Sequence, residues 1–95
     1  MKTVINGRIY NTDTMTTLCR RTAYHDGNEA GETRICKTRS GHYALVIDSN
    51  GQDLYRQDSI EAIQKQDIPN HIDGWNITDD DADLLIAEGI VTDDN

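Results

Sequence analysis

The chain has 95 residues, which is enough for one modest hydrophobic core, so we expect a single domain over residues 1–95. No stretch approaches the roughly 18 apolar residues of a membrane span, and no charged-then-apolar signal segment opens the chain. Two cysteines are too few for a disulfide framework. These features together predict a cytoplasmic protein. A formal net charge of −8 argues against direct binding to nucleic acid.

The chain opens with a predicted β-hairpin at residues 3–10, because Asn6-Gly7 is a preferred centre for a two-residue type I′ turn. Residues 11–14 predict a further turn, since Asn and Asp side chains bond back to their own backbone. Residues 15–24 are rich in Thr and predict a strand. Residues 26–31 are polar and punctuated by glycine, which predicts a mobile loop.

Three strands are predicted next, at residues 33–38, 42–48 and 52–56. Gly41 suits the first connecting turn and Asn50-Gly51 the second, so we expect an antiparallel meander. The middle strand holds the longest apolar run of the chain, which is typical of a central strand covered on both faces.

Two short helices are predicted toward the C-terminus. Asp58 and Ser59 suit the cap of a helix over residues 60–66, in which Ile60 and Ile63 share one side, and Pro69 is expected to stop it. We expect an irregular segment over residues 70–76, in which Trp75 packs against the sheet.

Thr78 is predicted to open the second helix, over residues 79–88, and Gly89 to end it. The side chains expected to face the core are Leu84, Leu85, Ile77 and Ile90. The predicted fold class is α+β: an antiparallel β-sheet of about four to five strands, arranged as a meander, with one or two short helices toward the C-terminus.

Charge divides the chain into two unlike parts. Residues 1–46 carry seven Lys and Arg against four Asp and Glu, a net charge of +3. Residues 47–95 carry two against thirteen, a net charge of −11, and no Lys or Arg follows Lys65. Such asymmetry predicts attraction to basic protein clefts.

The densest acidic cluster, Asp79, Asp80, Asp81 and Asp83, has two interpretations. Carboxylates in the first turn of a helix stabilise it by about 0.3–1 kcal/mol each, so helix capping by Thr78 and plain solvation explain part of the pattern. Close like charges also repel one another, which favours a surface that binds a cationic partner. We include Glu88 and Asp73 in this candidate surface, and Asp67, Asp93 and Asp94 as weaker candidates.

Other chemistry has less support in the sequence. Cys19, His25, Cys36 and His42 repeat a Cys-x5-His pattern, but five residues of strand separate such ligands too far for zinc, so we expect no metal and no cofactor. The basic residues of the first half predict solvated strand faces and pairing with the acidic half, or alternatively a secondary contact to guide RNA or an acidic partner. No nucleophile-base pair or phosphate-binding loop appears, and we expect a protein that is not an enzyme.

Three segments resemble a family of small proteins from phages and other mobile elements. Residues 5–14 are similar to its opening "NGxxYxTxT" hairpin, residues 36–43 to its "YRTxxGxY" strand-turn-strand, and residues 77–82 to the polar cap of its C-terminal helix. The compact acidic members of this family resemble anti-CRISPR inhibitors.

The resemblance implies a small acidic phage-type inhibitor in the cytoplasm of a host bacterium. It would bind the basic surface of a CRISPR effector complex, with carboxylates in place of DNA phosphates, and block DNA binding or assembly. One alternative is a homodimeric or larger accessory or structural protein of a mobile element that associates through an exposed strand edge. Another is an anti-restriction or regulatory protein.

Overall fold

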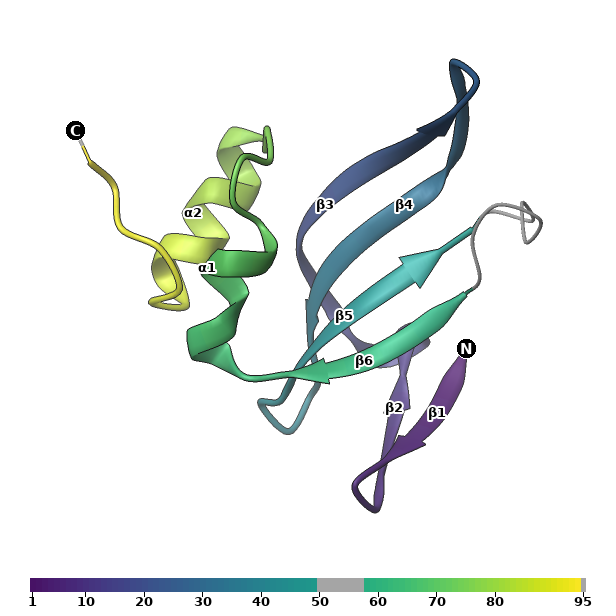
Figure 1. The fold of residues 1–95 in the computed structure, drawn as a ribbon. Helices are drawn as coiled ribbons and strands as arrows, with labels where there is room; N and C mark the ends of the chain where they lie inside the picture. Colours follow the sequence, from purple (N-terminus) through teal and green to yellow (C-terminus); the bar gives the residue numbers. More distant parts are fainter. Residues whose placement is uncertain (50–57, 95) are drawn as a thin grey trace.

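The computed structural model describes residues 1–49 and 58–94. Figure 1 shows a four-stranded antiparallel sheet in the order β3-β4-β5-β6, a separate hairpin, β1-β2, and two short helices. The fold is therefore α+β, as the sequence predicts. The elements are β1 (Lys2–Ile5), β2 (Arg8–Asn11), β3 (Thr16–His25), β4 (Asn28–Lys37), β5 (Tyr43–Asp48), β6 (Ser59–Ile63), α1 (Ile68–His71) and α2 (Asp79–Ala87).

The N-terminal hairpin confirms its prediction. Asn6 and Gly7 both adopt positive φ, at 51° and 76°, as a type I′ turn requires. The Asn11 side chain then accepts a hydrogen bond from the Asp13 amide at 3.0 Å and caps a single 3-10 turn over Thr12–Thr14. Local turn chemistry thus sets the course of the first 14 residues.

The hairpin of β3 and β4 differs in part from the prediction. The strand predicted over residues 15–24 is confirmed as β3. The mobile loop predicted over residues 26–31 is wrong, because β4 begins at Asn28. Asp26 and Gly27, with φ of 51° and 80°, complete the turn in two residues, and the chain re-enters the ladder at once.

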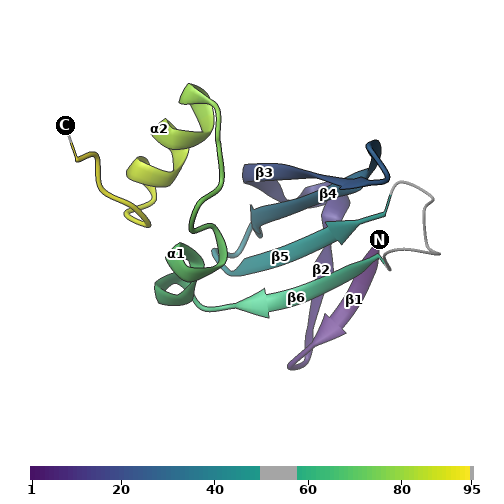
Figure 2. The same ribbon diagram turned by 45° about the horizontal axis from the view of Figure 1, so that its top comes forward.

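Strand β5 is covered on both faces, as its apolar run predicts. Ala44 and Val46 point to a core between the sheet and the hairpin, which we call the hairpin core. Leu45 packs on a second core, between the sheet and the helices, which we call the helix core. In Figure 2 the hairpin and the helices lie on opposite sides of the sheet. The chain therefore builds two cores that share one sheet.

The helix predicted over residues 60–66 is wrong, because this part of the chain is strand β6, followed by a 3-10 turn over Lys65–Asp67. Ile60 pairs with Val46 and points to the hairpin core, while Ile63 packs on the helix core. Two isoleucines three residues apart fit one side of a helix, but they also fit the two faces of a strand that is covered on both. The strand predicted over residues 52–56 lies outside the described residues.

Two predictions that depended on this helix, its cap and its end, are also wrong. Asp58 caps no helix, and its carboxylate accepts a hydrogen bond from the Ser49 amide at 2.6 Å. Pro69 does not end a helix but lies in the first turn of α1, where a missing N–H is not needed. Trp75 follows α1 and packs, half-buried, against the helix core, as predicted.

Helix α2 begins and ends as predicted. The Thr78 hydroxyl accepts a hydrogen bond from the Asp81 amide at 3.1 Å, and Gly89 after the helix has φ of 72°. Leu85 and Ile90 are buried in the core, which confirms half of the predicted core set. The prediction is wrong for Leu84 and Ile77, which are exposed. Leu84 lies on a side of α2 that does not face the sheet, and Ile77 precedes the helix.

No helix in the described parts of the chain has the length and apolar character needed to cross a bilayer.

Candidate partner-binding surface

Helix α2 divides the predicted acidic cluster between its sides. Asp81 lies one turn before the buried Leu85, and its charge contributes to the raised pKa of Cys19 in β3. Asp81 therefore faces the sheet. Asp79 and Asp83 lie together on another side, next to the C-terminal segment. Asp80 is exposed but lines neither of the grooves described below. The four aspartates therefore do not form one surface.

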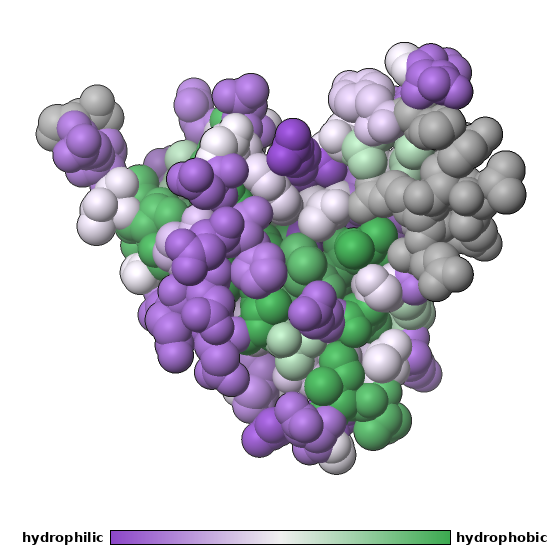
Figure 3. All heavy atoms as spheres, in the orientation of Figure 1, coloured by the Kyte–Doolittle hydropathy of each residue, from purple (hydrophilic) through white to green (hydrophobic). Residues whose placement is uncertain are grey.

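A groove of about 410 Å³ runs between α2 and the C-terminal segment. Its apolar part comes from Ala82 and Ile86 of the helix, from Ile77 before it and from Val91 after it. Figure 3 shows apolar side chains beside the C-terminal segment, bordered by hydrophilic ones. The full lining is Ile77, Asp79, Ala82, Asp83, Ile86, Val91, Thr92, Asp93 and Asp94.

A second groove, of about 290 Å³, adjoins the first and shares Ile77 and Val91 with it. It lies between α2 and the turn that follows α1, and Asp73 lines it. Its full lining is Pro69, Ile72, Asp73, Gly74, Trp75, Ile77, Leu85 and Val91. We call the two grooves together the acidic groove surface.

The described lining of the acidic groove surface is rich in carboxylates. Five aspartates contribute to it, and no Lys, Arg or His of the described residues lines either groove. Three of the predicted site residues, Asp73, Asp79 and Asp83, meet here, together with the weaker candidates Asp93 and Asp94. The predicted candidate Asp67 is exposed but does not line it.

Sequence reasoning missed the apolar floor of this surface. Residues 79, 82, 83 and 86 share one side of α2 at helical spacing, and this side alternates Asp with Ala and Ile. That spacing is a signal for a second, amphipathic side of the helix, next to the side that carries the buried Leu85. The contribution of Val91 depends on how the chain turns after Gly89.

Glu88 lies apart from the acidic groove surface, at the C-terminal end of α2. Both of its carboxylate oxygens accept hydrogen bonds from the Lys37 ammonium at 2.9 Å, and one also accepts from the Tyr43 hydroxyl at 2.7 Å. The bond from Lys37, and next the bond from Tyr43, hold the pKa of Glu88 below its ordinary value. Glu88 thus joins α2 to β4 and β5, and we leave it out of the surface.

Three of the basic residues of the first half make ion pairs within the molecule. Lys37 pairs with Glu88 of the acidic half. Arg20 and Arg34 lie opposite each other on β3 and β4, and both approach Glu32, at 3.8 Å and 3.4 Å. The Lys37 pair joins the basic half to the acidic half, as expected, whereas Glu32 belongs to the basic half itself.

The two cysteines lie on opposite faces of the sheet, Cys19 in the helix core and Cys36 in the hairpin core. Burial raises the pKa of Cys19 to about 11, with a smaller effect of Asp81, and burial also raises the pKa of Cys36. Both thiols are therefore protonated at neutral pH. Across the described residues, no three His, Cys, Asp or Glu side chains are arranged to hold a metal ion.

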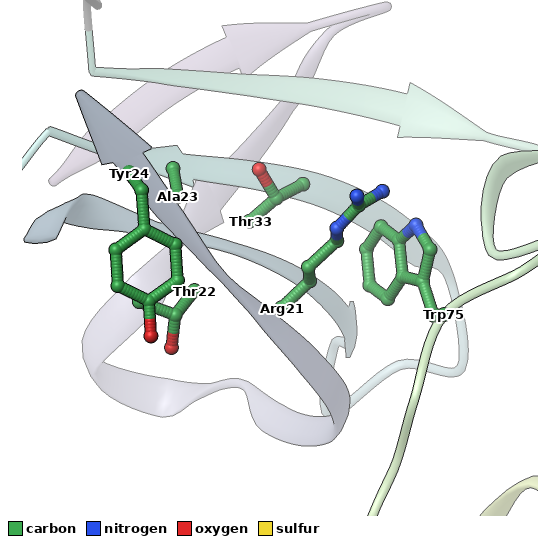
Figure 4. A pocket seen from close by; sticks show the side chains of 6 residues that line it. All are labelled: Arg21, Thr22, Ala23, Tyr24, Thr33 and Trp75. Carbon is green, nitrogen blue, oxygen red and sulfur yellow. The ribbon is translucent and has the colours of Figure 1, made fainter. Parts of the chain in front are cut away.

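A further hollow, of about 440 Å³, lies beside β3 and β4 and is also lined by Trp75. Arg21 reaches toward Trp75 along it, while Tyr24 points away from both (Figure 4). Its six lining residues are Arg21, Thr22, Ala23, Tyr24, Thr33 and Trp75, which include no carboxylate, histidine or cysteine. This set holds no acid-base pair for catalysis.

Comparison of the chain with protein-family models, with curated proteins and with solved structures gives no match.

Proposed function

We propose that this protein binds the basic surface of a nucleic-acid-processing partner and inhibits it by occupying a site that otherwise holds phosphates. The observation that carries the proposal is the acidic groove surface, where five aspartates of the described chain surround apolar side chains. Lys and Arg clusters that neutralise phosphates attract carboxylates by the same electrostatics.

Charge on the scale of the molecule supports this assignment. The half of the chain that builds β6, α1 and α2 carries a net charge of −11, while the basic residues Lys37, Arg20 and Arg34 pair with glutamates of the chain. Such a field speeds encounter with a cationic partner and repels nucleic acid itself.

The specific partner that we propose is a bacterial CRISPR effector complex in the host cytoplasm. The support for this identity is the resemblance of the opening hairpin and of the β4–β5 turn to motifs of small phage proteins. The chemistry of the surface supports a basic partner of any identity.

A pull-down from a bacterial lysate that contains CRISPR complexes tests the proposal at low and at high salt. The test variant is Asp79→Asn/Asp83→Asn, and the matched control, Asp13→Asn/Glu61→Gln, removes two exposed charges away from the grooves. We expect the wild type and the control to capture an effector subunit in a salt-sensitive way, and the test variant to lose it. Equal capture by all three proteins would contradict the acidic contact.

A second candidate function is self-association as an accessory protein of a mobile element. Val4 and Ile9 pair across the hairpin and are 70% and 72% exposed, which leaves apolar area for a second copy. Sedimentation of the wild type and of Val4→Thr/Ile9→Thr distinguishes this function, since a dimer that the variant abolishes would support it and a monomeric wild type would exclude it.

A further inference from the structure

We infer that the acidic groove surface takes a linear segment of the partner in which one bulky aliphatic side chain is flanked on both sides by Lys or Arg. This inference rests on the proposed function and adds the chemistry of the occupant. Its evidence is the combination of an apolar floor with an acidic border on two sides.

The apolar floor distinguishes this surface from a simple phosphate mimic. Ile77 and Ile86 are 36% and 39% exposed and line the same groove as Val91. Aspartates alone suffice to attract a basic surface, and they need no exposed isoleucine beside them. An aliphatic side chain of the partner would remove this apolar area from water.

The carboxylates border the floor from two separate parts of the chain. Asp79 and Asp83 come from α2, and Asp93 and Asp94 come from the C-terminal segment on the other side of the groove. A side chain inserted between them therefore has carboxylates on both sides. This arrangement matches a peptide with cations before and after the apolar residue.

The spacing along α2 fits an extended peptide. Asp79 and Asp83 are four residues apart, which is about 6 Å along a helix axis. The two residues that flank a central residue of an extended chain are about 7 Å apart, and successive side chains point to opposite faces. When the central side chain lies on the floor, long Lys or Arg side chains at the flanking positions reach the border carboxylates by bending back toward them. The groove volume of about 410 Å³ also lies within the roughly 300–1,000 Å³ of sites that bury a ligand.

Fluorescence anisotropy with two labelled peptides tests the inference. The probes are Gly-Lys-Arg-Leu-Arg-Lys-Gly and the same peptide with Ser in place of Leu. We expect the Leu peptide to bind the wild type about tenfold more tightly, because its side chain is buried on the apolar floor. Ile86→Ser should remove this preference, whereas Leu84→Ser, the same kind of change at an equally exposed side chain of α2 that lines neither groove, should keep it.

The outcomes separate the inference from the proposed function. If both peptides bind the wild type equally and Ile86→Ser changes neither, but Asp79→Asn/Asp83→Asn weakens both, the apolar anchor is wrong and the acidic contact stands. If the aspartate variant binds both peptides as the wild type does, the acidic contact fails as well. If neither peptide binds the wild type, the inferred occupant is wrong, and the pull-down alone decides the proposed function.

Discussion

At the scale of single residues, Gly31 shows how closely the strands approach at one point of the sheet. It lies in β4 with φ of 95°, a conformation that side-chain-bearing residues rarely adopt. A Cβ atom there would overlap the Asp48 carbonyl oxygen and lie 2.8 Å from the Ser49 carbonyl carbon. The obstacle is backbone, which cannot turn aside as a flexible side chain can.

We predict that Gly31→Ala lowers the free energy of unfolding by about 3 kcal/mol, from the sum of backbone strain and overpacking. Gly27 is the matched control, since its φ is 80° but a Cβ there meets nothing within 4 Å. Gly27→Ala should cost only the backbone strain, about 1 kcal/mol. Urea unfolding measures both values, and equal losses would contradict the steric explanation.

Glu88 gives a prediction about pH. Because its pKa is lowered in the folded state, the stability that its bonds to Lys37 and Tyr43 contribute is fully present above the ordinary value of 4.5. It is lost as the pH falls through the lower folded pKa. Glu88→Gln should therefore be less stable than the wild type at neutral pH, and this difference should shrink below 4.5.

Chemical unfolding at a series of pH values measures the difference. The control is Glu61→Gln, which alters an exposed carboxylate that makes no described ion pair. If the wild type remains more stable than Glu88→Gln by the same free energy well below pH 4.5, the carboxylate charge is not the source of the difference.

The role of Glu88 could not be predicted from the sequence, where it is one more acid in an acidic half. Its partner Lys37 is 51 positions away, and only the packing of α2 on the sheet brings the two together. Asp79 and Asp83 can be predicted as site residues because they belong to the densest acidic cluster of the chain, which is local information.

At the scale of elements, local chemistry predicts some parts of the fold and fails at others. The first hairpin can be predicted because Asn6-Gly7 favours its turn, and the start of α2 because Thr78 caps the helix. In both cases the residues that determine the backbone conformation are neighbours in the sequence. Strand β6 cannot be predicted in this way, because residues 59–63 pair with β5, and this tertiary pairing overrides a local pattern that also fits a helix.

The cap of α2 gives a prediction at this scale. Thr78→Ala removes the side-chain acceptor of the Asp81 amide and should lower the free energy of unfolding by about 1 kcal/mol. Thr92→Ala is the control, because Thr92 is exposed and caps no helix. Thermal unfolding of the two variants gives the comparison, and a loss as large for Thr92→Ala would refute the role of the cap.

At the scale of the whole molecule, the charge asymmetry is visible in the sequence but the acidic groove surface is not. Ile77, Ile86 and Val91 become one floor only when the chain turns back after α2. The five aspartates are likewise gathered from the turn after α1, from α2 and from the C-terminal segment. Such gathering depends on tertiary structure, which periodicity does not encode.

The gathered charge predicts a response to salt. Sodium chloride at physiological strength should raise the unfolding midpoint by about 2–5 °C over low salt, because it screens repulsion among the aspartates. Asp79→Asn/Asp83→Asn should show a smaller rise than the Asp13→Asn/Glu61→Gln control. Calorimetry measures the three shifts, and an equal rise in both variants would place the repulsion elsewhere.

The two cores also impose an order on synthesis at the ribosome. The hairpin β1-β2 is made first, and its apolar partners arrive with β5 and β6, so the first core closes when residue 63 has emerged. Leu18 and Ile35, on the other face, become buried only after Ile68, Leu85 and Ile90 have been synthesised. A nascent chain that stops after β6 but before α2 is complete has one face of the sheet covered and the other, apolar face exposed to water. Chains with exposed apolar surface bind chaperones and aggregate.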